Sequence, residues 1–235
     1  MTSHLFEDKP AQARLDGEPV VPAQPQHTKP DMPLPRTFGA HRRLGILAER
    51  IADCTRCNLH ATCDRKVFMR GSHKADVLFL GAAPSEIDVE QGAPLMGHAG
   101  DLLNRIIEAM GLRQTEVCIA TICRCAPPDQ RDPTMEEMKA CIPYLHEHIA
   151  LIQPRVIVAM GAAAAKGILQ TGVGIKGIRG SWKLYRRAIP VMVTFHPSFL
   201  LRETEAGRVD AKRDLWTDMQ AVMERIGRPV KREQQ

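Results

Sequence analysis

Four short runs of apolar residues recur along the chain, and each is continuous rather than alternating with polar residues. They cover residues 76–81, 116–121, 155–161 and 190–196. Such runs are typical of strands buried on both faces of a sheet. Between them, residues 99–110, 134–152 and 162–169 repeat apolar positions at helical spacing, and the second segment opens with Thr134 and Glu137 in a capping-box arrangement. Strand alternating with helix predicts an α/β fold with a parallel sheet covered on both faces.

The N-terminal part of the chain has a different composition. Residues 1–36 contain seven prolines and few large apolar residues, so we expect a disordered tail there. Leu44, Leu47 and Ile51 have the spacing of an amphipathic helix over residues 41–52. The folded domain is expected to span residues 37–228 and to be followed by a short disordered tail at 229–235.

Glycine and polar residues follow each predicted strand. In a parallel α/β sheet, ligands bind beyond the carboxyl ends of the strands. We therefore expect the functional site at that edge. The segments concerned are residues 81–85, residues 121–128, Gly161 and His196-Pro197-Ser198.

Composition narrows the choice of partner and compartment. Lys and Arg exceed Asp and Glu by five, a mildly basic balance that is compatible with a polyanionic partner. No apolar run approaches the ~18 residues of a membrane helix, and residues 1–14 lack a signal-peptide pattern. We expect a cytoplasmic protein without membrane contact. Seven cysteines in a reducing compartment indicate metal or redox work rather than disulfides.

Four of the cysteines form two candidate ligand pairs. Cys54 and Cys57 form a CxxC motif after the first predicted helix, while Cys125 and Cys141 lie far downstream around a proline-rich loop. Four thiolates suit an iron–sulfur cluster or a tetrahedral zinc site. Spacing alone leaves open the alternative of buried, inert cysteines. The remaining cysteines are Cys63, Cys118 and Cys123, of which Cys118 is expected in the core and Cys123 is a rival for the third ligand position.

Taken in order, these motifs resemble the iron–sulfur uracil-DNA glycosylases known as family 4, over residues 50–226. The resemblance depends on the ordered set rather than on any single element. Its members are Cys54-Thr-Arg-Cys57, Gly81-Ala-Ala-Pro-Ser85, residues 91–97 (QGAPLMG), Ala99-Gly100, residues 125–133 (CAPPDQRDP), Cys141, Met160-Gly161, Arg179-Gly180 and residues 194–198 (TFHPS).

The resemblance implies a three-layer α/β/α sandwich with a four-stranded parallel central sheet. It also implies a [4Fe–4S] cluster held by Cys54, Cys57, Cys125 and Cys141, with a structural role near the DNA. The partner is DNA, and we expect the protein to act as a monomer. The implied activity is that of a DNA glycosylase, which flips a nucleotide out of the stack and cleaves its N-glycosidic bond.

Two residues are the catalytic candidates by resemblance. His196 is expected to donate to the base oxygen on which negative charge develops; the alternative is a histidine that merely ends a strand before Pro197. Asp88 is expected to orient the attacking water. A solvated loop aspartate is the competing interpretation, and Glu86 and Glu90 are acidic rivals nearby.

Further residues are expected to contact substrate. Phe199 and Leu200 lie shortly before Arg202. An apolar side chain beside an arginine can fill the space that a flipped base leaves in the stack, while the arginine binds a phosphate. Alternatively, Phe199 and Leu200 are buried in the domain. Arg179 lies in a glycine-rich basic loop with Lys176, whose composition ordinary solvation would also explain. The predicted pocket residues are Ala82, Ala83, Pro84, Ser85, Leu95 and Thr121, and the predicted DNA contacts are Arg179, Ser198, Phe199, Leu200 and Arg202.

The pocket positions depart from the family pattern together. The first motif of the family is typically Gly-Glu-Ala-Pro-Gly, whereas Ala82 and Ser85 stand at its second and last positions here. Leu95 replaces the aromatic residue that stacks on uracil, and Thr121 replaces the asparagine that binds uracil's edge. A hydroxyl cannot make the paired contact of an amide, and the smaller side chains free space. The departures favour a bulky modified pyrimidine, such as a modified cytosine in foreign or phage DNA.

Two other functions fit parts of the pattern. One is an ordinary uracil-DNA glycosylase of base excision repair that tolerates these replacements. The other is a non-catalytic DNA-binding module that keeps the fold and the cluster; retention of His196-Pro197-Ser198 argues against it. An electron-transfer protein would explain the cysteines but would leave the strand-end motifs without a purpose.

Overall fold

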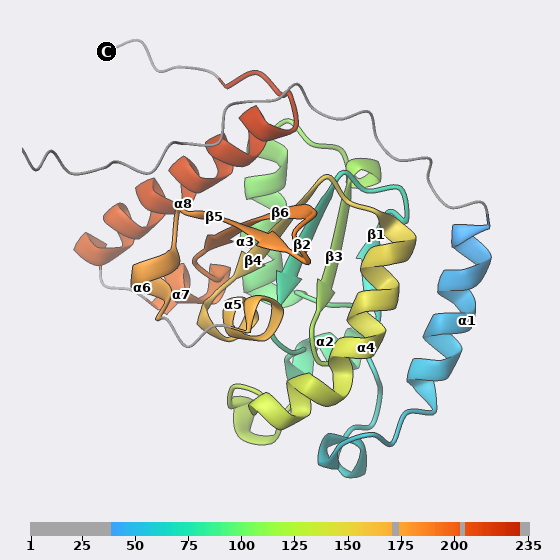
Figure 1. Ribbon diagram of the computed structural model, residues 1–235. Helices are drawn as coiled ribbons and strands as arrows, with labels where there is room; N and C mark the ends of the chain where they lie inside the picture. Colours follow the sequence, from blue (N-terminus) through green and yellow to red (C-terminus); the bar gives the residue numbers. More distant parts are fainter. Residues whose placement is uncertain (1–38, 171–173, 203–204, 231–235) are drawn as a thin grey trace, which may run out of the picture. The chain divides into compact units, whose positions relative to one another are not determined.

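The central feature of the computed structural model is a sheet with the strand order β1-β3-β2-β4-β6-β5 (Figure 1). Its middle strands are the four that the apolar runs predict, and they pair in parallel. Their bounds are β2 Val77–Gly81, β3 Val117–Thr121, β4 Val156–Met160 and β6 Ile189–Thr194. The structure describes residues 39–170, 174–202 and 205–230. The predicted N-terminal tail and most of the C-terminal one lie outside these residues.

The prediction of a four-stranded, purely parallel sheet was wrong, because two antiparallel strands form the edges. β1 (Met69–Gly71) pairs with β3, and β5 (Trp182–Tyr185) pairs with β6. β1 is only three residues long, and β5 exposes its two middle residues. Neither strand therefore shows the continuous apolar run by which the central strands were found.

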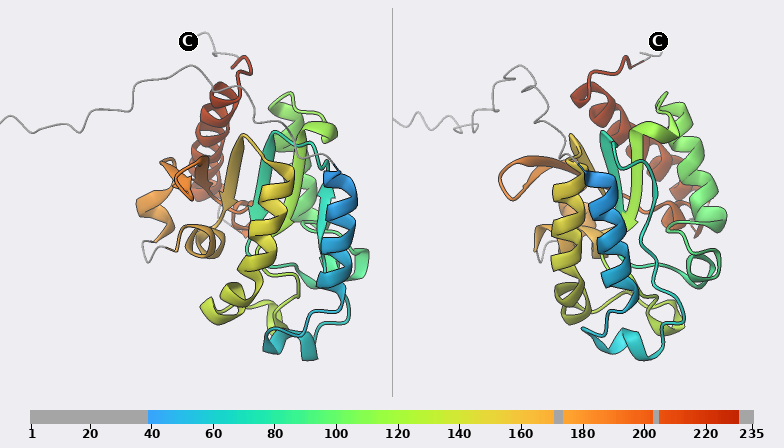
Figure 2. Two further views of the ribbon diagram at one scale, coloured as in Figure 1. Left: turned by 45° about the vertical axis from the view of Figure 1, so that its right-hand side comes forward. Right: turned by 90° about the vertical axis from the view of Figure 1, so that its right-hand side faces the viewer.

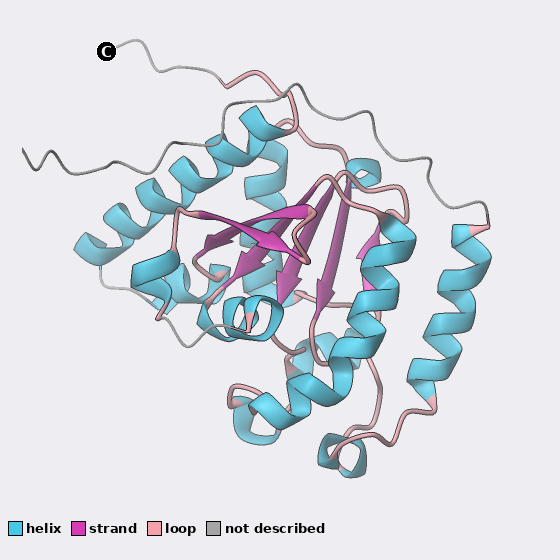
Figure 3. Ribbon diagram, in the orientation of Figure 1, coloured by secondary structure: helices cyan, strands magenta, loops and turns pink. Residues whose placement is uncertain are grey.

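Helices cover both faces of the sheet, which confirms the expected three-layer α/β/α arrangement (Figures 2 and 3). Alternate side chains of β2 enter different cores: Leu78 and Leu80 pack on one face, Val77 and Phe79 on the other. The first core is covered by α1 Ala40–Ala52, α4 Met135–Ile152, α5 Ala162–Leu169 and α6 Ile175–Ile178; the second by α3 Gly97–Ala109, α7 Pro197–Arg202 and α8 Glu205–Arg225.

Helix starts follow local capping chemistry. The side chain of Thr134 accepts a hydrogen bond from the amide of Glu137, whose carboxylate accepts from the Thr134 amide, so the predicted capping box begins α4. A second capping box, of Ser85 and Asp88, begins α2. The remaining short elements are η1 Asn58–Ala61, α2 Glu86–Gln91, η2 Gln114–Glu116 and η3 Pro128–Gln130. Among the described residues, no helix is both long and apolar enough to cross a membrane.

Candidate active site

The carboxyl ends of the parallel strands bring the predicted site residues together. Gly81 pairs with Thr121 in the register of β2 and β3. A Cβ atom on Gly81 would lie 3.3 Å from Cγ2 of Thr121 and 3.5 Å from Cδ1 of Leu95. Gly161 lies equally close to the histidine motif: its Cβ would be 3.2 Å from Cβ of His196, and its own φ is +87°. Both the backbone angle and the close approach require glycine at position 161.

His196 is partly buried and has a defined tautomer. Its Nδ1 lies 3.2 Å from the backbone nitrogen of Ser198 and 2.8 Å from the hydroxyl of Ser198. An amide N–H can only donate, so Nδ1 must be the acceptor. In the neutral ring the proton therefore resides on Nε2, the arrangement needed to donate a hydrogen bond to a substrate.

The electrostatics of the site keep this histidine neutral. Burial lowers the pKa of His196 to about 4, Arg202 lowers it further, and Asp88 and Asp132 act in the opposite direction. At neutral pH the ring is an uncharged donor. It can donate from Nε2 to a developing negative charge while Nδ1 accepts from the Ser198 amide.

Asp88 is the buried member of the acidic group after β2, whereas Glu86 and Glu90 are exposed. One of its carboxylate oxygens accepts from the amide of Ser85 at 2.9 Å, and the other accepts from the amide of Met96 at 2.6 Å. Asp88 thus ties the start of α2 to the loop that precedes α3. Each oxygen uses one of its acceptor positions in these bonds and keeps another.

The loop that carries Leu95 is fixed by an arginine that the sequence analysis did not single out. Arg70 donates to the carbonyl oxygens of Pro94 (2.8 Å) and Leu95 (3.0 Å), and to the side chain of Asn104 (3.0 Å). Leu95 itself has a φ of +53°. A Cβ on Gly100 would collide with the Leu95 carbonyl oxygen. Because the main partners are backbone carbonyls, no residue pattern in the sequence signals this role of Arg70.

Thr121 has no free hydroxyl proton to offer a base. Its side chain is 1% exposed, and Oγ1 donates to the carbonyl oxygen of Cys123 at 2.7 Å. The neighbouring pocket loop is also tied to this strand, since the amide of Cys123 donates to the carbonyl of Ala82 at 2.9 Å. Within that loop Pro84 is buried, Ala82 and Ala83 are half-buried, and Ser85 is exposed.

The leucines of α7 differ in exposure. Leu200 is 2% exposed and packs in the core with α3 and α8, whereas its neighbour Leu201 is 46% exposed. Leu200 is therefore buried within the domain, as the alternative interpretation expects, and its contact with DNA stays a prediction. Leu201 is the leucine that solvent or DNA would meet. Phe199 stacks on Phe195 with 4.9 Å between ring centroids, and Arg202 is exposed.

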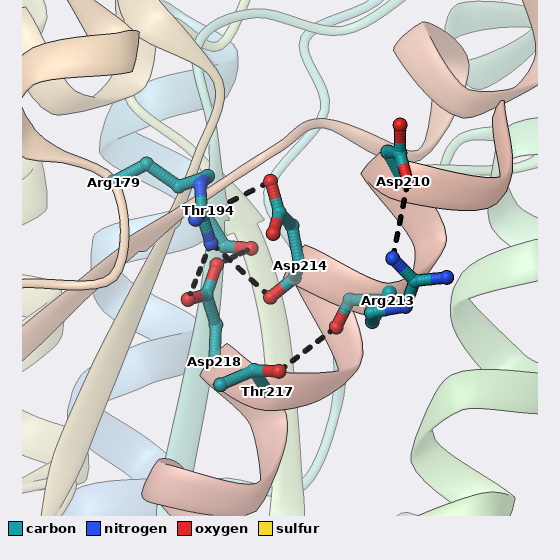
Figure 4. Close-up of polar contacts among 7 residues, drawn as sticks. All are labelled: Arg179, Thr194, Asp210, Arg213, Asp214, Thr217 and Asp218. Atoms are coloured by element: carbon teal, nitrogen blue, oxygen red, sulfur yellow. Dashed lines mark hydrogen bonds and ion pairs between the residues drawn. The ribbon is translucent and has the colours of Figure 1, made fainter. Parts of the chain in front are cut away.

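Arg179 is engaged within the protein. Its guanidinium forms ion pairs with Asp218 at 3.0 Å and with Asp214 at 3.3 Å, both on α8 (Figure 4). The predicted contact of Arg179 with DNA stays a prediction, and the side chain of Lys176 lies outside the described residues. The carboxylate partners lie more than thirty positions downstream, so loop composition could not reveal them.

The four cysteines predicted as ligands line one pocket. The lining comprises Cys54, Cys57, Cys125 and Cys141 together with Ile51, Arg56, His60, Lys66, Arg124 and Tyr144.

Basic residues balance the charge that thiolates would bring to this pocket. Arg124 is fully buried, and its Nε has no hydrogen-bond partner among the described residues. A hydrogen bond with Cys123 lowers the pKa of Cys141; the Arg124 amide and the positive charges of Arg124 and Arg56 support the shift, and burial opposes it. Burial instead raises the pKa of Cys125. The donor set is rich in sulfur and surrounded by cations, which fits an anionic metal–thiolate group.

Comparison with known proteins decides the family. The model of the uracil DNA glycosylase superfamily matches residues 68–220. The chain belongs to this superfamily. The matched segment contains all six strands of the sheet, as well as the strand ends that carry Gly81, Thr121, Gly161 and His196.

Curated relatives place the chain near the type-4 members of the superfamily. It is 38% identical over 161 residues to a type-4 uracil-DNA glycosylase of Thermotoga maritima, a match that covers 67% of this chain and 82% of the relative. A type-4 enzyme of Pyrobaculum aerophilum is 33% identical over 176 residues, or 72% and 89% of the two chains. A type-5 enzyme of the same organism matches only 83 residues at 31% identity, 35% and 36% of the two chains. The predicted family and enzyme class, a DNA glycosylase, are thus confirmed.

Proposed function

We propose that this protein flips a pyrimidine nucleotide out of DNA and hydrolyses its N-glycosidic bond to leave an abasic site. The observation that carries the proposal is the neutral, Nε2-protonated His196 at the edge where the parallel strands end. As the bond breaks, the base acquires negative charge and the sugar positive charge. A hydrogen bond from Nε2–H to a base oxygen becomes stronger in that transition state than in the ground state.

Water must attack the sugar from the opposite side of the breaking bond, and Asp88 is our candidate for orienting it. The carboxylate accepts hydrogen bonds from the amides of Ser85 and Met96. Its remaining acceptor positions can accept a hydrogen bond from the attacking water. The backbone of residues 82–85 is proposed to line the nucleotide pocket. Ser198, Phe199, Arg202 and the exposed Leu201 are proposed to face the DNA.

We further propose that the preferred base is a bulky modified pyrimidine, for example a modified cytosine of foreign or phage DNA. The hydroxyl of Thr121 is committed to the Cys123 carbonyl, so this position cannot supply the paired contact with which an amide selects uracil. Ala82 and Leu95 add space in the same region. Ordinary uracil excision is the second candidate, which the identity with type-4 uracil-DNA glycosylases favours.

The pocket lined by Cys54, Cys57, Cys125 and Cys141 is proposed to hold a [4Fe–4S] cluster. All four thiols line this one pocket, and four cysteine thiolates are the usual ligand set of such a cluster. When bound, it would cross-link the segment after α1, the loop after β3 and α4. We assign it a structural role. We also propose that the protein acts as a monomer in a reducing compartment such as the cytoplasm.

Base release from matched DNAs tests this function. The substrates carry uracil, thymine, 5-hydroxymethylcytosine or glucosylated 5-hydroxymethylcytosine, and His196→Ala is the control. We expect release of a modified base that the variant abolishes. Release of uracil alone would refute the altered specificity. Binding of DNA with no release of any base would instead identify a non-catalytic module.

A further inference from the structure

The strand that leads to His196 is anchored to α8 through a buried carboxylate. Oγ1 of Thr194, the last residue of β6, donates to Oδ2 of Asp218 at 2.6 Å. Both side chains are almost fully buried. The anchor lies two residues before the histidine, on the opposite side of the sheet from the cysteine pocket.

Arg179 completes this anchor. It binds the second oxygen of Asp218 at 3.0 Å and also the carbonyl oxygen of Asp214 at 3.2 Å (Figure 4). Its guanidinium also lies 5.5 Å from the ring centroid of Phe195, the residue between Thr194 and His196. The arginine therefore contacts both the carboxylate that holds Thr194 and the side chain next to the histidine.

The following glycine permits this close arrangement. The amide of Gly180 donates to the carbonyl of Val193 at 3.0 Å, so the Arg179 segment hydrogen-bonds to the end of β6. A Cβ atom on Gly180 would lie 3.1 Å from Oδ1 of Asp218, and its φ is +70°. The Arg-Gly pair thus brings the guanidinium to a carboxylate that a larger residue would push away.

We propose that Arg179 and Asp218 are positioning residues that hold the Thr194–Phe195 segment and thereby place the ring of His196. This inference deepens the proposed function and depends on it. It assigns Arg179 to the inside of the protein instead of to a DNA phosphate. Base excision is sensitive to such placement, because a shift of about 1 Å in a catalytic group can cost on the order of 100-fold in rate.

A matched set of variants separates positioning from other roles. Asp218→Asn keeps the size of the side chain but offers one acceptor oxygen where two are used. Thr194→Val removes the hydroxyl at nearly constant shape, and Thr194→Ser retains it. The control is Asp210→Asn, because Asp210 pairs with Arg213 of the same helix at an exposed position (Figure 4).

Three measurements are made on each purified full-length variant: the single-turnover rate of base release, the Kd for DNA as a function of salt, and the ¹⁵N resonances of the His196 ring. We expect Asp218→Asn and Thr194→Val to slow release by about 10- to 100-fold with unchanged Kd, and to shift the His196 resonances. Thr194→Ser and Asp210→Asn should behave as wild type.

If wild type is active, two results would overturn the inference. A lower melting temperature with an unchanged release rate and unchanged His196 resonances would reduce the network to a stability element. For Arg179→Gln, a phosphate contact would appear as a higher Kd for DNA. In addition, the slope of log Kd against log salt concentration would be smaller by about one. If wild type releases no base at all, the proposed function fails. The His196 resonances then decide the inference alone, and unchanged resonances in Thr194→Val would refute it.

Discussion

Lowering the pH from 7 to 5 should destabilise the protein through His196. A histidine in the unfolded chain has a pKa of about 6.5, whereas burial lowers the pKa of His196 to about 4 in the folded protein. Between these values the unfolded chain carries the proton and the folded protein does not. The free energy of unfolding therefore falls as the pH falls through this window, and the contribution is fully lost below pH 4.

The size of the effect follows from the two pKa values. Each unit of difference corresponds to about 1.4 kcal/mol. At pH 5 the unfolded histidine is almost completely protonated, whereas the folded one is about one-tenth protonated, so the loss relative to pH 7 is about 2 kcal/mol. Below pH 4 the loss reaches about 3 kcal/mol. Both figures belong to His196 alone.

Urea unfolding of wild type and His196→Gln at both pH values isolates this contribution. His148 is fully buried, and its pKa also lies well below the ordinary value, but it titrates in both proteins and cancels in the comparison. Wild type should lose about 2 kcal/mol more than the variant. The rate of base release should stay flat down to about pH 5. Equal losses in the two proteins, or a rate that declines with an apparent pKa near 6.5, would refute a neutral, buried histidine.

Other substitutions test the remaining parts of the site. Leu201→Ala should slow base release from duplex DNA by about tenfold with little change in melting temperature, because part of the unstacking energy is no longer recovered. Leu200→Ala should instead lower the free energy of unfolding by about 2–5 kcal/mol. The reverse pattern would contradict the assignment of the exposed and buried leucines. Thr121→Asn should raise the release of uracil relative to modified bases, measured as a ratio of kcat/KM values, and an unchanged ratio would show that this position does not select the base. Cys125→Ala should abolish bound iron and the absorbance near ~400 nm, whereas the control Cys118→Ala should retain both. Iron retained in Cys125→Ala, or stoichiometric zinc in wild type, would contradict the proposed ligand set.

The spacing of apolar residues predicted the four central strands but missed the two edge strands and α8. The four parallel strands are continuous apolar runs because both their faces are covered. The edge strands β1 and β5 face solvent or are too short to form a pattern. Helix α8 was also missed, although its residues Leu215, Met219 and Val222 repeat at helical spacing and are buried. Asp218 interrupts that apolar series, and a carboxylate in such a place is the signal that could have revealed a buried ion pair.

Residue types predicted which amino acids gather at the strand ends, but not which atoms remain free. The sequence places a threonine where the family has an asparagine, but only the folded structure shows that the hydroxyl of Thr121 is already hydrogen-bonded. Leu200 and Leu201 are chemically identical, and the rotation of a six-residue helix decides which one is exposed. Arg179 and Asp218 are 39 positions apart. Pairings of this kind depend on tertiary packing, which local composition does not encode.

The bond between Thr194 and Asp218 has a consequence for synthesis on the ribosome. Translation makes the strand ends, the four cysteines and His196 before it makes α8, and the carboxylate that anchors β6 emerges 24 residues after its threonine partner. N-terminal segments begin to fold while the rest is still being made. If the anchor places the histidine, an incomplete chain can expose its DNA-facing surface without being able to excise a base. The order of synthesis would then restrict base excision, which leaves abasic sites in DNA, to chains in which α8 has docked.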